Sequence, residues 1–325
     1  MQKADSPRPL AIARGAAALV LGPVREGYVY SVFRRAANLW APPNTLLAVT
    51  APTAMRVPNG VVVDAPTWAP ETAFLGLGVA MPAWIGDGFI RIPAARFCIN
   101  VDAAPLWDAR PQFPERTISP EFLAQHLDRL DCLVRDSARG NPWCFASVLD
   151  PLERERREAC LERVAHRARP AVSDLLAGIA ANETDRISAG TRRLAGLGHG
   201  LTPSGDDFLI GVCGALALVG AALPSRAVCQ QAGTCDDQAA AVAAAAAGRT
   251  TLLSSIWLDH AARGEFSAEV GDVLVTLADT NATGLEVAAT RLLAVGDLSG
   301  LDTAAGVLLG SRAALSSNRR HPSRA

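Results

Sequence analysis

The sharpest restriction on the fold is a change of sequence pattern near residue 116. Before that point, short apolar runs alternate with Pro and Gly, and Pro rules out long helices because it lacks an amide hydrogen and clashes with the preceding turn. Strand-like runs lie at 17–21, 28–33, 45–50, 60–63 and 97–101. Many short strands at this spacing predict a small β-barrel or β-sandwich.

After residue 116 the pattern becomes helical. Ser119-Pro120-Glu121 places Ser at a cap position and Pro in a first turn. Apolar residues then recur at helical spacing. We expect helices at 153–169, 171–181, 207–223, 236–247, 251–263, 268–277, 285–293 and 301–315. The prediction is an α+β protein with a β-rich domain (1–115), an α-helical domain (116–315) and a frayed tail (316–325).

Composition excludes several classes of function. The chain has 325 residues and a net charge of −1, which gives no electrostatic footprint for nucleic acid. Lys3 is the only lysine, so the chain has neither a Gly-Lys-Ser/Thr phosphate loop nor an interior lysine for a Schiff base. The seven cysteines are scattered without a C-x-x-C pair, as expected for reduced thiols in a cytoplasmic protein.

Two apolar segments bear on membrane targeting. Residues 16–21 follow three basic residues, as in a signal peptide, but the run is brief and we expect it to form the first β-strand. Residues 208–223 are apolar on every face, yet they are too few for a comfortable membrane span and follow Asp206 and Asp207. We therefore expect a buried core helix and no membrane partner.

The richest motif is Gly196-Leu-Gly-His-Gly-Leu-Thr-Pro-Ser-Gly-Asp-Asp-Phe208, which stands directly before that helix. A weaker copy begins at Ser299, 95 positions after Ser204, and both copies read Ser-Gly-x-Asp-x-x-x-Gly. The first turn of a helix carries unpaired N–H groups and partial positive charge, and glycines let a ligand approach the backbone. The two corners therefore predict one site for a small anionic ligand. They could instead be two well-capped helices with no ligand.

Candidate site residues follow from this interpretation. The candidate catalytic residues are Asp206, Asp207 and the loop histidine His199, which could act as acid or base. The candidate substrate-binding residues offer N–H, hydroxyl, amide or carboxylate groups; they are Gly200, Thr202, Ser204, Gly205, Thr250, Thr251, Ser299, Gly300, Asp302, Asn38 and Asn59.

Other interpretations of these residues stay open. Thr250 and Thr251 could equally be helix caps, and Asn59-Gly60 is first a turn signal. Asp206, Asp207 and Asp302 could together hold Mg²⁺ through oxygen ligands, with Asp207 and Asp302 as the preferred pair.

These residues resemble a known family. The string from Gly196 to Gly211 is similar to the signature of the AllH-like family, formerly a domain of unknown function, whose best-known member is the H subunit of oxamate carbamoyltransferase. The likeness extends over most of the chain. It includes Tyr30-Ser31-Val-Phe and Asn38 early, Thr250-Thr251 with Ser254-Ser255 in the middle, and Ser299-Gly-Leu-Asp-Thr303 late.

The resemblance implies a subunit of a carbamoyltransferase complex in allantoin catabolism, a branch of purine degradation. Such a complex would exchange oxalurate and phosphate with oxamate and carbamoyl phosphate, and its other subunits would be partners of this chain. Whether this chain holds the active site or completes it for its partners is left open, as is the alternative of a noncatalytic scaffold subunit.

A shorter likeness points elsewhere. Ser299-Gly-Leu-Asp-Thr-Ala-Ala-Gly306 is similar to the Gly-Asp-x-Asp-Thr-x-x-x-Gly stretch of ADP-ribosylglycohydrolases, although only one of the two aspartates is present. That resemblance implies a metal-dependent hydrolase as an alternative.

Overall fold

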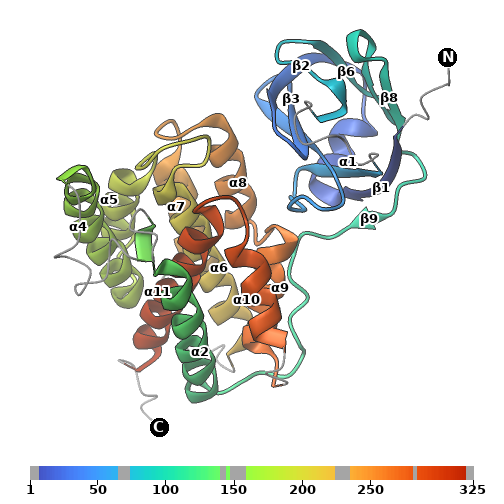
Figure 1. Cartoon of the computed structure of the whole chain (residues 1–325). Helices are drawn as coiled ribbons and strands as arrows, with labels where there is room; N and C mark the ends of the chain where they lie inside the picture. Colours follow the sequence, from blue (N-terminus) through green and yellow to red (C-terminus); the bar gives the residue numbers. More distant parts are fainter. Residues whose placement is uncertain are drawn as a thin grey trace. The chain divides into compact units, whose positions relative to one another are not determined.

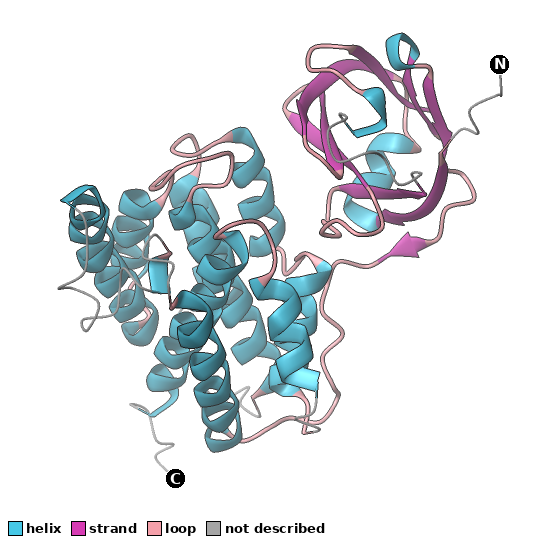
Figure 2. Cartoon of the chain, viewed as in Figure 1, coloured by secondary structure: helices cyan, strands magenta, loops and turns pink. Residues whose placement is uncertain are grey.

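A computed structural model describes residues 7–64, 74–139, 144–146, 159–223, 235–280 and 284–319 of the chain. The chain divides into two compact units, Met1–Ala109 and Arg110–Ala325 (Figure 1). Strands occupy the first unit and helices fill the second (Figure 2). The predicted α+β class is confirmed.

The first unit is a curled nine-stranded sheet with the order β8-β7-β6-β2-β3-β4-β5-β1-β9. The pairs β4–β5 and β1–β9 are parallel, and the other neighbours are antiparallel. The strands are β1 (Arg8–Ala13), β2 (Arg25–Val32), β3 (Ala36–Ala41), β4 (Thr45–Thr50), β5 (Gly60–Asp64), β6 (Pro82–Gly86), β7 (Phe89–Ile92), β8 (Phe97–Asn100) and β9 (Leu106–Trp107). Two 3₁₀ turns, Phe74–Gly76 and Pro93–Ala95, complete the unit.

The expected first strand at 17–21 is wrong. This segment lies in helix α1 (Arg14–Val20), and the first strand is β1, just before it. Three consecutive alanines give the segment high helix propensity, and a short apolar run cannot by its period separate helix from strand. The apolar core of this unit includes three residues of α1, Ala16, Leu19 and Val20. The curled sheet surrounds α1 in Figure 1.

The second unit is helical and has its own apolar core. Its described helices are α2 (Pro120–Ala138), α4 (Ala159–Ala181), α5 (Thr184–Leu194), α6 (Ser204–Ala222), α7 (Cys235–Ala246), α8 (Leu252–Ala262), α9 (Ala268–Ala278), α10 (Leu285–Leu293) and α11 (Ser299–Arg319). The predicted cap of α2 is confirmed, because the Ser119 hydroxyl accepts the amide hydrogen of Phe122 at 3.1 Å.

The predicted helices and tail of this unit need three corrections. The separate helices at 153–169 and 171–181 are, within the described residues, one helix, α4, which contains Pro170. Helix α5 was not expected at all, because its sequence is mostly polar. Helix α11 continues to Arg319, so the tail is shorter than predicted, and residues 320–325 lie outside the described part.

Helices α6 and α11 lie side by side at the centre of the unit. Helix α6 is apolar and long enough to cross a membrane by composition, but 83% of its most apolar window is buried inside the protein. The expectation of a core helix is therefore confirmed for α6.

Glycines set the close approach of these two helices. A Cβ added at Gly211 would lie 2.0 Å from the carbonyl oxygen of Thr303, and one at Gly306 would lie 2.1 Å from that of Phe208. No side chain fits at either position, since the two backbones occupy that space. This contact brings the first turns of α6 and α11 together.

Candidate functional site

The two Ser-Gly-x-Asp corners meet at the start of α6 and α11. The hydroxyl groups of Thr202 and Ser299 lie 3.0 Å apart, although 97 positions separate them in the chain. Burial raises the pKa of Asp207, and the charge of Asp302 in the other corner adds to this effect. The structure thus joins the two corners that the sequence predicted to face one site.

Both corners place a glycine tightly against the end of the preceding helix. The amide of Gly205 donates to the carbonyl oxygen of Leu197 at 2.8 Å, and that of Gly300 donates to Val295 at 3.0 Å. A Cβ at Gly205 would lie 2.1 Å from a carbonyl oxygen of the preceding helix, and one at Gly300 would lie 1.8 Å from its counterpart. These glycines are required because the loop folds back tightly against the helix start.

Asp206 fixes the first corner from within. Its Oδ1 accepts the amide hydrogen of Gly196 at 2.8 Å, and its Oδ2 accepts from the hydroxyl of Thr250. Burial raises the pKa of Asp206, and these hydrogen bonds partly oppose that effect. Both oxygens therefore have protein partners that hold the loop, and the predicted catalytic role of Asp206 stays a prediction.

Asp207 and Asp302 form a buried carboxyl pair. Burial raises the pKa of Asp207 well above its ordinary value, and hydrogen bonding from Ser299 and Thr202 opposes this. Burial also raises the pKa of Asp302, to about 7. The cause in both cases is desolvation, which disfavours the charged form.

One hydrogen-bond partner of this carboxyl pair is not predicted by the sequence. The backbone amide of Phe145 donates to Oδ1 of Asp302 at 2.5 Å across 157 positions of the chain. The hydroxyl of Ser204 also lies near Asp302 and lowers its pKa. A backbone donor carries no residue-type signal, so no pattern in the sequence could have found Phe145.

The candidate serines and threonines have different contacts: one caps a helix, and others contact the carboxyl groups at the two corners. Thr251 caps α8, since its hydroxyl accepts the amide hydrogen of Ser254 at 3.1 Å, and it also donates to the carbonyl of Leu201 at 2.7 Å. Pro203 occupies the cap position of α6 and makes no side-chain capping hydrogen bond, so Ser204 does not cap this helix. The hydroxyls of Ser204 and Ser299 instead serve the carboxyl pair.

His199 and Gly200 lie at the exposed tip of the first corner. Gly198 and Gly200 both have positive φ angles, 127° and 94°, which a non-glycine residue adopts only with strain. His199 has no hydrogen bond to any residue in the described ranges, and its catalytic role stays a prediction.

Asn38 and Asn59 belong to the first unit, where each has a structural partner. The side-chain amide of Asn38 donates to the Ser31 hydroxyl at 3.0 Å, and that of Asn59 donates to the Leu46 carbonyl at 2.9 Å. Asn59 lies in a turn, as predicted, but that turn leads into parallel pairing of β4 with β5 rather than a hairpin. Their role in ligand binding stays a prediction.

The magnesium hypothesis gains no support from this geometry. Among the residues that the structure describes, no group of three or more His, Cys, Asp or Glu is placed to hold a metal ion. Asp206 already uses both oxygens on protein donors.

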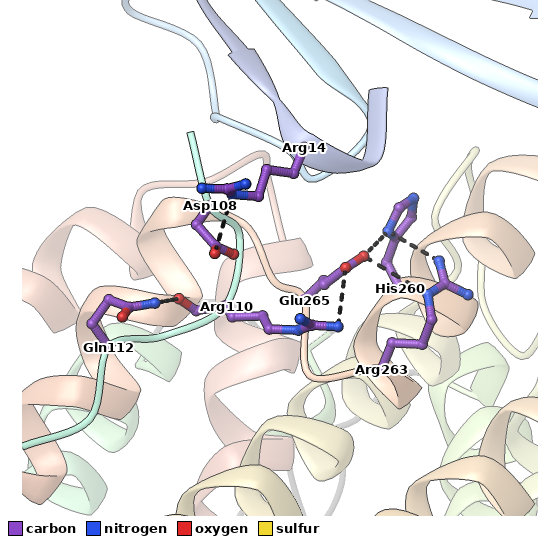
Figure 3. Close-up of polar contacts among 7 residues, drawn as sticks. All are labelled: Arg14, Asp108, Arg110, Gln112, His260, Arg263 and Glu265. Atoms are coloured by element: carbon purple, nitrogen blue, oxygen red, sulfur yellow. Dashed lines mark hydrogen bonds and ion pairs between the residues drawn. The ribbon is translucent and has the colours of Figure 1, made fainter. Parts of the chain in front are cut away.

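A second polar cluster, at the end of α8, was not anticipated (Figure 3). Nδ1 of the buried His260 lies 2.6 Å from Oε2 of Glu265, and Arg263 and Arg110 lie near the same carboxylate. Burial lowers the pKa of His260, with Glu265 opposing that shift. His260 is thus buried with Glu265 as its hydrogen-bond partner.

The fold and the corners define a two-unit α+β protein with a duplicated Ser-Gly-x-Asp helix start. Residues 9–106 match the model of the AllH family N-terminal domain, and residues 194–311 match that of the oxamate carbamoyltransferase subunit AllH. The chain belongs to the AllH family. No curated protein and no solved structure matches it.

Proposed function

We propose that this chain is a cytoplasmic subunit of an oxamate carbamoyltransferase-like complex and that its paired corners bind the small anionic substrate. The observation that carries the proposal is the contact between the corners, in which the Thr202 and Ser299 hydroxyls lie 3.0 Å apart. This contact forms within residues 194–311, the range that matches the subunit model.

The chemistry of the corners suits an anion. Thr202, Ser204 and Ser299 are half-buried and offer hydroxyl donors. The starts of α6 and α11 add the positive ends of two helix dipoles, although the amides of Gly205 and Gly300 already donate to carbonyl oxygens of the protein. Oxamate and carbamoyl phosphate each present an oxyanion that such donors can bind.

Calorimetric titration of the full chain tests substrate binding. We expect heat and a saturable isotherm with oxamate or with carbamoyl phosphate, and weaker binding of the same ligand by Ser299→Ala. Asp272→Asn, an exposed change on α9, is the control and should bind as the wild type does. A chain that binds neither ligand would overturn substrate binding here.

The complex requires a separate measurement. Affinity purification of the tagged chain from its native host should recover other proteins in fixed stoichiometry, and oxamate-dependent phosphate release from carbamoyl phosphate should follow that fraction. Recovery of the chain alone would contradict the complex.

A noncatalytic scaffold subunit is the second candidate, and one observation favours it. Several corner groups already have protein partners, including both oxygens of Asp206 and the hydroxyl of Thr251. A scaffold would join the complex but bind neither ligand, so the two experiments together separate the candidates.

A further inference from the structure

The helical unit contains two matching halves that contact each other reciprocally. Gly211 and Gly306 are 95 positions apart, as are Phe208 and Thr303. Gly211 faces the Thr303 carbonyl, while Gly306 faces the Phe208 carbonyl. Each glycine thus contacts the residue that corresponds to the one contacted by the other glycine. Such a reciprocal contact is isologous, as at a two-fold axis. Helices α6 and α11 therefore cross with approximate two-fold symmetry.

The polar residues of the corners obey the same relation. The Ser299 hydroxyl stabilises charged Asp207, and the Ser204 hydroxyl stabilises charged Asp302. Each corner thus supplies a serine to the carboxyl group of the other. The approximate two-fold axis exchanges α6 with α11 and therefore Asp207 with Asp302. The two carboxyl groups consequently lie on opposite sides of this axis.

One oxygen of this arrangement lacks a partner. Asp302 is 0% exposed, and Oδ1 accepts from the Phe145 amide. Oδ2 is buried and has no hydrogen bond of normal geometry to any residue that the structure describes. A buried carboxylate oxygen without a donor is costly, so this position favours a group that donates a hydrogen bond.

We propose that Asp207 and Asp302 together bind the NH₂ group of a primary amide or carbamoyl ligand, each carboxyl group accepting one N–H. This inference rests on the proposed function and adds which end of the substrate meets the carboxyl pair. A planar NH₂ group has two equivalent donors, which match two equivalent acceptors on either side of an axis. The oxyanion end of the ligand then lies toward the starts of α6 and α11, where the helix dipoles are positive.

A pair of isosteric ligands tests the inference on the unmodified full chain. Oxamate and pyruvate share a carboxylate and a neighbouring carbonyl, and they differ in having NH₂ or CH₃ at the same position. A site that hydrogen-bonds the NH₂ group rejects the methyl analogue, so pyruvate should bind at least roughly tenfold more weakly than oxamate. Calorimetric titration of each ligand gives this ratio.

The outcomes separate this inference from the proposed function. Equal affinities for oxamate and pyruvate would overturn recognition of the NH₂ group and leave substrate binding standing. Binding of neither ligand would overturn both. A large preference for oxamate supports the carboxyl pair as the receptor of the NH₂ group.

A variant then assigns the preference to this pair. Asp302→Asn keeps the size of the side chain and an oxygen for the Phe145 amide, but it places an NH₂ group where Oδ2 stood. Oxamate affinity should fall by roughly tenfold while pyruvate affinity is unchanged. Asp272→Asn is the matched control and should retain the wild-type preference. An Asp302→Asn chain that also retains it would overturn the role of Asp302.

Discussion

The first and second corners of the helical unit both end in a Ser-Gly step at a helix start, but they differ in what holds the loop before it. Asp206 ties the first corner to Gly196 and Thr250, whereas the equivalent position in the second corner is Leu301, a buried apolar residue. The first loop is also longer, since Gly205 follows Leu194 by eleven positions while Gly300 follows Leu292 by eight. The longer loop carries His199 and therefore needs the additional anchor.

This difference separates two kinds of residue. Residues repeated in both corners, such as Ser204 with Ser299 and Asp207 with Asp302, interact across the contact between α6 and α11. Asp206, present once, serves its own loop. Four measurements test this division.

The largest effect is expected where the two halves touch. Gly306→Val places side-chain atoms in the space of the Phe208 carbonyl oxygen, so α6 and α11 must separate. We expect a loss of about 5 kcal/mol in the free energy of unfolding, enough to unfold the helical unit of a protein of ordinary stability. Urea unfolding followed by circular dichroism measures this.

Gly271→Ala is the matched control for that change. A Cβ there would make only an ordinary contact, 3.8 Å from Pro111, within α9. Alanine favours the helix, so stability should rise by about 0.5–1 kcal/mol. Equal losses in both variants would contradict the specific role of the α6–α11 contact.

The carboxyl pair predicts a pH effect on stability. The Asp302 carboxyl has a pKa of about 7 in the folded protein against an ordinary value of 3.8. The folded state therefore binds the proton of this carboxyl group more tightly than the unfolded state does. The contribution of Asp302 to the free energy of unfolding consequently falls as pH rises from about 4 to about 7. The loss is on the order of 4 kcal/mol, because one pKa unit corresponds to about 1.4 kcal/mol.

Asp302→Asn removes this titration and isolates it from other groups. The difference in unfolding free energy between the wild type and the variant should change steeply over this pH range and level off above it. Parallel pH profiles for the two proteins would rule out the raised pKa of Asp302.

The anchor of the first corner should have an intermediate effect. Asp206→Ala leaves the Gly196 amide and the Thr250 hydroxyl without their acceptor and should cost about 2–3 kcal/mol. Thr250→Val removes one of the same bonds. A double-mutant cycle should therefore show coupling between the two changes. Additive losses would show that the short contact between these side chains contributes little.

The smallest effects are expected for the paired serines. Ser204→Ala and Ser299→Ala should each cost about 1 kcal/mol in unfolding free energy, and Ser299→Ala should cost more because it also loses the contact to Thr202. The cap variant Ser119→Ala should cost a similar amount without changing oxamate binding. A serine pair with opposite effects would break the equivalence of the corners.

Much of the fold could be predicted from sequence because it depends on local pattern. Helix α10 was placed at its observed bounds, and the cap of α2 follows from Ser119-Pro120. Helix α1 was missed because its apolar segment is short, and α5 because most of its residues are polar. In both cases packing against neighbouring elements, which periodicity does not reveal, stabilises the helix.

The amino-acid sequence alone predicts a β-rich part and a helical part, and it shows that one glycine-rich corner occurs twice. These properties follow from residue types at fixed spacing. The folded protein adds that Asp206 turns inward to its own loop, that the two serines interact with the opposite carboxyl groups, and that the Phe145 amide donates to Asp302. Those contacts join segments far apart in the chain, and they exist only because two helices without side chains at their crossing can approach so closely.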